Sequence, residues 1–146
     1  MGPIRTPTAA ATIERILHAF VAEEQPQVRG MLAEGLAGIV AQQLIRTADG
    51  KGRVAALEIL IGTSAIASMI REGKVFQIAS KMQSSQNLGM QTLDMHLERL
   101  VAANTITPEA AMEKAQDKEA FAKVLQRLNP DFEVPEFDLG EGGGSH

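Results

Sequence analysis

The sequence contains no cysteine, tryptophan or tyrosine, and aromatic residues make up only 3% of it. Without cysteine the chain can form neither a disulfide nor a thiolate metal site. Because aromatic residues are so few, leucine, isoleucine, valine, alanine and methionine must fill the core, and this composition favours helices. The longest apolar runs are far shorter than the roughly 20 residues of a membrane-spanning helix, so we expect no direct membrane insertion.

Basic charge is also scarce, and the net charge of the chain is -4. No lysine or arginine follows Asn129, whereas five acidic residues do: Asp131, Glu133, Glu136, Asp138 and Glu141. The rest of the chain is nearly neutral. A nucleic-acid surface needs a cluster of basic residues, so we expect no nucleic-acid partner.

A phosphate-binding loop is missing from this sequence. The nearest match is Gly50-Lys51, but Ile45 stands where the first glycine of the motif is required, and Gly52 stands where serine or threonine is required. Without that loop no lysine can hold the β- and γ-phosphates of ATP. We therefore expect that this chain by itself is not an enzyme.

Residues that bind metals or act as nucleophiles form no convincing set. Glu14 and His18 are four residues apart and can share one helix face, but a metal site needs further ligands. No arrangement of serine, histidine and aspartate stands out. We expect no metal and no cofactor in this chain.

Two helices are predicted in the first part of the chain. Residues 1–5 are interpreted as a start or tag remnant, and Thr6-Pro7 then marks the beginning of a helix, because proline is favoured at the first helical position. A second helix begins at Pro26 and ends near Val40. The apolar stripe of the first helix comprises Ile13, Ile16, Leu17 and Phe20.

A β-hairpin is predicted at about residues 41–61. Its turn signal is Asp49-Gly50-Lys51-Gly52, and the partner strands are residues 41–47 and the alternating segment RVAALEILI. One face of the second strand carries Ala55, Leu57, Ile59 and Ile61. Glu58 falls on the opposite side, which we interpret as the polar one, and we expect a cross-strand or interface partner for it there.

The pattern is helical from residue 63 to residue 128. The predicted N-caps of four helices are Thr63 or Ser64, Thr92, Thr107 and Asp117, and Gly73 is predicted to end the first of them. Residues 129–146 are acidic and contain proline and glycine, so we expect a disordered tail. The predicted fold class is mainly α with a small β-hairpin.

Several stretches resemble the type IV pilus retraction ATPases, the PilT twitching-motility family. The segment GRVAALEIL is followed by IREGK, GMQTLD and ITPEAA in the order and spacing of that family. Upstream, PTAAATIERILHAFVAEEQPQVRGMLAEGLAGIVAQQL resembles the last part of the family's RecA-like ATPase core. The resemblance covers roughly residues 6–128, and such repeated local agreement is not expected by chance.

The resemblance implies a place for this chain within a larger machine. Residues 6–62 would be the C-terminal end of the RecA-like core, and residues 63–128 a helical C-terminal domain. The resemblance implies a hexameric motor, in which ATP turnover drives pilus disassembly and twitching motility. The implied partners are neighbouring subunits and the platform proteins of the pilus at the inner membrane. The implied location is cytoplasmic, and ATP and Mg would bind the full-length relative.

The family's helical domain carries a motif written AIRNLIRE, which retraction requires. It corresponds here to Ala65-Ile66-Ala67-Ser68-Met69-Ile70-Arg71-Glu72, so Ala67 replaces the motif's first arginine and Ser68 replaces its asparagine. The resemblance implies that Arg71-Glu72 is the charged end of an effector helix. Helix capping is the other interpretation, but a helix C-terminus favours basic residues only, so capping explains one residue of the pair.

Two functions remain open at this point. The chain is either a noncatalytic C-terminal part of a retraction motor or a stand-alone helical adaptor between proteins. A part of a RecA-like sheet would leave Ile13, Ile16, Val40 or the hairpin partly uncovered, whereas an adaptor would be a well-covered monomer.

Overall fold

The computed structural model describes residues 8–133 of the chain. It is mainly α-helical with one two-stranded sheet, so the predicted fold class is confirmed. The strands are β1 (Gly38–Arg46) and β2 (Arg53–Ile61), and three single-turn helices are η1 (Ala22–Glu24), η2 (Val75–Gln77) and η3 (Gln86–Leu88). The α-helices are α1 (Ala9–His18), α2 (Gln25–Gly35), α3 (Ser64–Arg71), α4 (Ile78–Gln83), α5 (Leu93–Ala102), α6 (Pro108–Lys114) and α7 (Lys118–Leu128).

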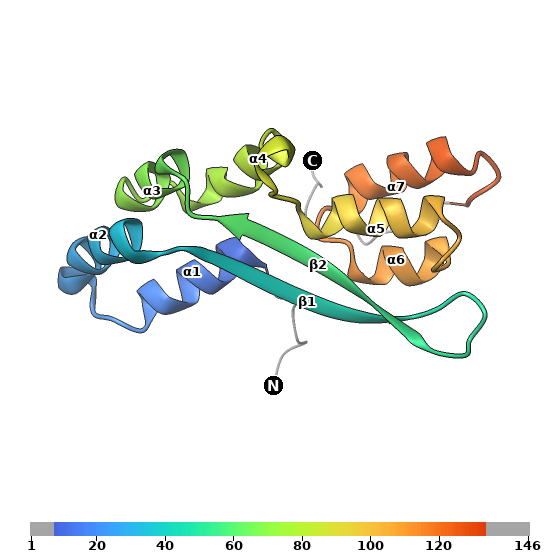
Figure 1. Ribbon diagram of the computed structural model, residues 1–146, viewed down its shortest axis with the longest axis horizontal. Coiled ribbons are helices and arrows are strands. Elements are labelled where there is room, and N and C mark those ends of the chain that lie inside the picture. Colours follow the sequence, from blue (N-terminus) through green and yellow to red (C-terminus); the bar gives the residue numbers. More distant parts are fainter. Residues whose placement is uncertain (1–7, 134–146) are drawn as a thin grey trace, which may run out of the picture.

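The antiparallel hairpin runs through the middle of the molecule (Figure 1). Its register runs from the pair of Gly38 and Ile61 to the pair of Arg46 and Arg53. The predicted turn is confirmed, and Gly50 has a φ of +74°, a left-handed conformation that glycine adopts without strain. Helices α1, α2 and α3 surround the open end of the hairpin, and α5, α6 and α7 cover the half near the turn.

The hairpin begins earlier than predicted. Helix α2 ends at Gly35, and β1 already starts at Gly38 rather than near residue 41. Val40, predicted at the end of the helix, is therefore a strand residue paired with Ile59. The apolar spacing of this segment fits a helix and a strand equally well over a few residues, which is why the boundary was misplaced.

The four later N-caps are confirmed. Thr63, Thr92, Thr107 and Asp117 each accept a hydrogen bond from the backbone N–H of the third residue of their helix. Helix α1 begins at Ala9 and is capped in the same way by Thr8, so the predicted start at Thr6-Pro7, which lies outside the described residues, was about two residues too early.

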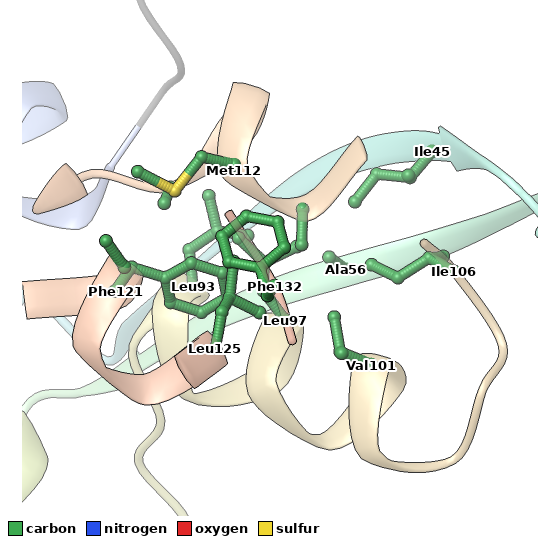
Figure 2. Close-up of a cluster of buried hydrophobic side chains, with 13 residues drawn as sticks. Ile45, Ala56, Leu93, Leu97, Val101, Ile106, Met112, Phe121, Leu125 and Phe132 are labelled. Carbon is green, nitrogen blue, oxygen red and sulfur yellow. The ribbon is translucent and has the colours of Figure 1, made fainter. Parts of the chain in front are cut away.

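Buried apolar side chains form two groups along the hairpin. The N-terminal cluster comprises Ala9, Ile13, Leu17, Ala33, Leu60, Ile66, Ile70, Val75, Ile78, Met82 and Met90. The C-terminal cluster, shown in Figure 2, comprises Ile45, Ala56, Leu93, Leu97, Val101, Ile106, Ala111, Met112, Ala115, Phe121, Ala122, Leu125 and Phe132. Helices α3 and α4 thus pack with α1 and α2, although the predicted division of the chain falls at residues 62 and 63. That division stays a prediction, because core packing alone does not define a domain.

The side of β2 that carries Glu58 is its buried side, so the interpretation of that side as polar was wrong. Ala56, Glu58 and Leu60 are almost fully buried, while their neighbours on the other face are only half-buried. Glu58 can lie there because both of its carboxylate oxygens accept backbone hydrogen bonds. Sequence patterning treats a glutamate as a surface residue and cannot foresee such donors.

Two other burial predictions also need correction. Of the predicted apolar stripe, Ile13 and Leu17 are buried, whereas Ile16 on α1 is 38% exposed and Phe20, two residues past the end of α1, is 42% exposed. Phe132 is only 7% exposed and belongs to the C-terminal cluster, so the ordered chain continues past the predicted start of the tail at residue 129. Residues 1–5 and the rest of the predicted tail, 134–146, lie outside the described residues.

Candidate functional site

The predicted motif lies on α3 and the turn that follows it. The helix begins at the N-cap Thr63, whose hydroxyl accepts the N–H of Ile66 at 3.3 Å. Ile66 and Ile70 are fully buried in the N-terminal cluster. They are four residues apart and therefore share one face. These two side chains anchor the helix and fix which face of the motif is turned away from the core.

The other motif residues fall into two groups according to their exposure. Ala65, Ala67, Ser68 and Met69 are partly buried, and Arg71 and Glu72 are exposed. Ala67 and Met69 contact the N-terminal cluster. The structure therefore brings the apolar residues of the motif to the core and its two charged residues to the surface at the end of the helix.

A Schellman motif ends α3. Gly73 has a φ of +76°, its N–H donates to the carbonyl of Ile70 at 3.1 Å, and the N–H of Lys74 donates to the carbonyl of Met69 at 2.8 Å. These bonds satisfy carbonyl groups that the helix leaves free. Because they fix the backbone, Arg71 and Glu72 are held at a defined place on the surface.

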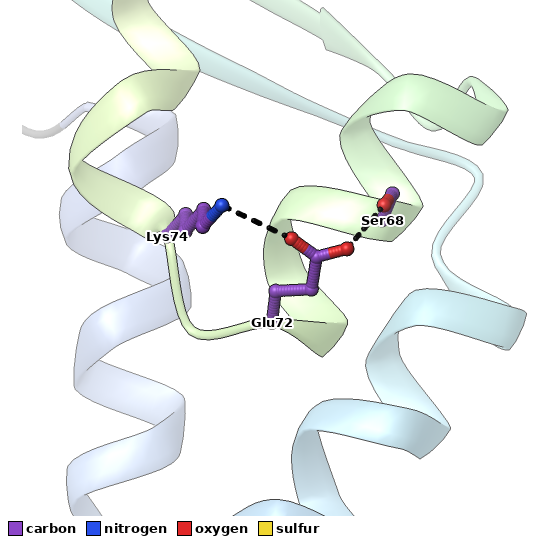
Figure 3. Close-up of polar contacts among 3 residues, drawn as sticks. All are labelled: Ser68, Glu72 and Lys74. Atoms are coloured by element: carbon purple, nitrogen blue, oxygen red, sulfur yellow. Dashed lines mark hydrogen bonds and ion pairs between the residues drawn. The ribbon is translucent and has the colours of Figure 1, made fainter.

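The carboxylate of Glu72 is held by two neighbours, as Figure 3 shows. The hydroxyl of Ser68 donates to Oε2 at 3.1 Å, and Nζ of Lys74 lies 3.3 Å from Oε1. The Ser68 hydrogen bond, and then Lys74, lower the pKa of Glu72. Sequence reasoning saw Ser68 only as a departure from the family motif and did not connect Lys74 with Glu72.

Arg71 differs from Glu72 in its surroundings. Within residues 8–133 the ion pair between Glu72 and Lys74 is the only one, so Arg71 has no acidic partner there. Phe76, two residues past Lys74, is 76% exposed. An unpaired arginine and an exposed aromatic ring are the residue types that carry binding energy in protein interfaces. The sequence analysis did not single out Phe76.

A cleft of about 350 Å³ is a second feature, which the sequence did not indicate. Three acidic residues line it, namely Glu58, Asp94 and Asp117. The Asp94 carboxylate accepts the N–H groups of Gln116 at 2.8 Å and Asp117 at 3.0 Å, and burial raises its pKa in spite of these bonds. Since Glu58 and Asp94 already bind backbone groups, their oxygens serve the fold rather than a ligand.

Metal-binding geometry is absent from the described residues. Between residues 8 and 133, no three histidine, cysteine, aspartate or glutamate side chains are placed so that together they could hold a metal ion, the three carboxylates of the cleft included. Glu14 and His18 share α1 and are both exposed. Within the same residues, every helix is too short or too polar to cross a bilayer.

Comparisons with known proteins identify relatives of this chain. The type IV pilus retraction ATPase PilT of Pseudomonas aeruginosa is 51% identical over 120 residues, which cover 82% of this chain and 35% of that protein. The twitching motility protein of Neisseria gonorrhoeae is 46% identical over 121 residues, which cover 83% of this chain and 32% of the relative. No family model matches the sequence.

A solved structure agrees with these relatives. The crystal structure of the pilus retraction motor PilT with bound ADP matches at a TM-score of 0.70 and 40% identity, over 80% of this chain and 32% of the other. The chain is thus related to motor ATPases of type IV pili. Within that class it belongs with the PilT twitching-motility proteins, so the resemblance seen in the sequence is confirmed. It spans about a third of the length of these relatives.

Proposed function

We propose that this chain is the noncatalytic C-terminal part of a hexameric pilus retraction motor and transmits ATP-driven motion to pilus disassembly. Residues 6–62 then form the end of the RecA-like core, and residues 63–128 form the helical C-terminal domain. ATP and Mg bind elsewhere in the longer protein. The partners are neighbouring subunits and the inner-membrane platform of the pilus, reached from the cytoplasm.

The observation that carries the proposal is the arrangement of α3. Ile66 and Ile70 fix one side of the helix in the N-terminal cluster, and the Schellman motif then presents Arg71 and Glu72 at the surface. A rigid anchor with exposed charges can pass a movement of the core to a partner. The effector set is Ala65, Ile66, Ala67, Ser68, Met69, Ile70, Arg71 and Glu72.

The adaptor alternative is less well supported. An adaptor that acts alone would cover its apolar residues, yet Val40 is 66% exposed and Ile16 is 38% exposed. Such surfaces are typical of protein contacts. Ile13 does not add to this argument, because it is fully buried.

A segment exchange tests the proposal. The 120 residues of the Pseudomonas aeruginosa PilT that match this chain are replaced by the matching residues of this chain, and twitching is measured in cells that lack their own PilT. We expect the chimera to hydrolyse ATP and to restore twitching. Hydrolysis without any twitching would contradict a retraction role for this chain.

The purified chain provides the complementary test. We expect no magnesium-dependent ATP turnover above buffer, because no phosphate loop is present in the sequence. Turnover that increases in proportion to the protein concentration would show that this chain is itself catalytic.

A further inference from the structure

Glu58 is a buried carboxylate that stands between the two hydrophobic clusters. On the same face of β2, Ala56 belongs to the C-terminal cluster and Leu60 to the N-terminal cluster. The Glu58 side chain is only 5% exposed, and no cationic side chain of residues 8–133 forms an ion pair with it. A buried charge needs compensation, so the surroundings of Glu58 must supply it in another way.

Two helix N-termini provide that compensation. Oε2 of Glu58 accepts the N–H of Ala9, the first residue of α1, at 2.7 Å, and Oε1 accepts the N–H of Leu93, the first residue of α5, at 2.9 Å. A helix N-terminus carries a partial positive charge. Hydrogen bonds to a carboxylate are also stronger than bonds between neutral groups.

The threonine caps cannot replace Glu58. Thr8 accepts the N–H of Ala11, and Thr92 accepts the N–H of Met95, so each cap serves the third residue of its helix. The amides of the first residues depend on Glu58 instead. Ala9 and Leu93 are almost fully buried, so water cannot readily take the place of the carboxylate.

We propose that Glu58 couples the N-terminal and C-terminal clusters, so that they open as one unit. Helix α1 belongs to the first cluster and α5 to the second, and one carboxylate holds the first turn of both. If either helix moves away, a buried amide and an oxygen of Glu58 lose their partners. The hairpin and the hydrogen bonds between Ile59 and Gln91 attach α5 to β2, but they do not hold α1.

The test is native-state hydrogen exchange on the whole chain. Leu97→Ala disturbs the C-terminal cluster alone, and exchange is followed at the amides of Ile13 and Leu17 in α1. Leu97→Ala is made in the native background, with Glu58→Gln and with Glu14→Gln. Glutamine keeps the size of Glu58 but has only one acceptor oxygen. Its NH₂ group would face one of the two backbone N–H groups, and two donors cannot form a hydrogen bond. Glu14 is exposed on α1 and serves as the matched control.

In the native and Glu14→Gln backgrounds, we expect Leu97→Ala to speed exchange in α1 by about tenfold or more. In the Glu58→Gln background, Leu97→Ala should leave the exchange rate in α1 nearly unchanged, while it still speeds exchange in α5. An equal acceleration of α1 in all three backgrounds would overturn the proposal. If Glu58→Gln does not fold, the native background decides: acceleration confined to the C-terminal cluster overturns the coupling, and acceleration in both clusters supports it.

Discussion

The N-terminal and C-terminal clusters share one hairpin but differ in how many large apolar side chains are exposed around them. The exposed large apolar residues of the described chain are Ile16, Phe20, Val21, Met31, Val40, Leu44, Phe76, Leu88 and Leu128. Leu128 alone belongs to α5, α6 or α7. The others lie on β1 or on the segments around the N-terminal cluster.

This difference indicates two kinds of unit within one chain. The C-terminal cluster closes its own core, with Phe132 packed against it. The residues of the N-terminal cluster are buried, but the surface around them carries exposed apolar side chains. Such a surface is expected where another protein segment packs. Helix α3 is anchored in this second kind of unit through Ile66 and Ile70, so the proposed effector motif lies in the part of the molecule whose outer surface is apolar.

Leu97→Ala should have the largest effect on stability. Leu97 is fully buried at the centre of α5, and its truncation leaves a cavity that should lower the free energy of unfolding by about 4 kcal/mol. Urea unfolding measures the change. Leu128→Ala on α7 is the control, because Leu128 is 41% exposed, and a comparable loss for both variants would mean that the C-terminal cluster is misassigned.

Phe132→Ala tests where the C-terminal cluster ends. Because the ring is buried with the cluster, its removal should lower the free energy of unfolding by about 3 kcal/mol. The exposed neighbour Glu133 provides the control variant Glu133→Ala. An unchanged urea midpoint for Phe132→Ala would place the ring outside the core.

The fold was predictable wherever local chemistry decides it. The caps at Thr92 and Thr107, the turn at Gly50 and the helix end at Gly73 all follow from residues that need no distant partner. Phe132 could not be placed in this way, because its burial depends on helices that precede it in the chain. Its acidic neighbours gave the segment the composition of a disordered tail.

His96→Gln should change how stability depends on pH. Nδ1 of His96 accepts the N–H of Leu57 at 2.8 Å, and burial, followed by the nearby charge of Arg99, lowers the pKa of His96 below its usual 6.5. The unfolded chain therefore takes up the proton first, and stability falls as the pH drops below that value. When His96 is protonated, Nδ1 can no longer accept this hydrogen bond, and its loss should lower the free energy of unfolding by about 1 kcal/mol.

The pH dependence is measured as urea unfolding midpoints above and below pH 6.5, the usual pKa of histidine. The native chain should lose stability on the acidic side, and His96→Gln should lose less, because an amide oxygen accepts a hydrogen bond but is not protonated there. His18→Gln is the control, since His18 is exposed on α1. The same pH dependence in all three proteins would exclude His96 as the cause.

Replacing Val40 and Leu44 together by lysine should affect association rather than folding. Both side chains are exposed on β1, so the free energy of unfolding should change by less than about 0.5 kcal/mol. We expect the native chain to self-associate through this surface and the variant to sediment as a smaller species. Leu128→Lys on α7 is the control, and equal effects of the two changes would remove the contrast between β1 and the C-terminal helices.

The candidate site was predictable only in part. Family resemblance pointed to the motif. The hydrogen bond from Ser68 to Glu72 and the exposure of Phe76 depend on side-chain orientation, which a linear pattern does not record. Glu58 was noticed, but its two backbone donors lie 49 and 35 residues away in the sequence.

The most direct test of the retraction role is Arg71→Ala with Glu72→Ala in the chimeric motor. Both side chains are exposed, so the melting temperature should barely change. The matched control is Glu14→Ala with Arg15→Ala, an exposed acidic and basic pair on α1. Twitching is measured in cells, together with ATP hydrolysis by the purified motor. We predict that the Arg71 and Glu72 change impairs twitching while hydrolysis stays within a few fold, and that the control leaves both intact. Normal twitching after the Arg71 and Glu72 change would contradict the account.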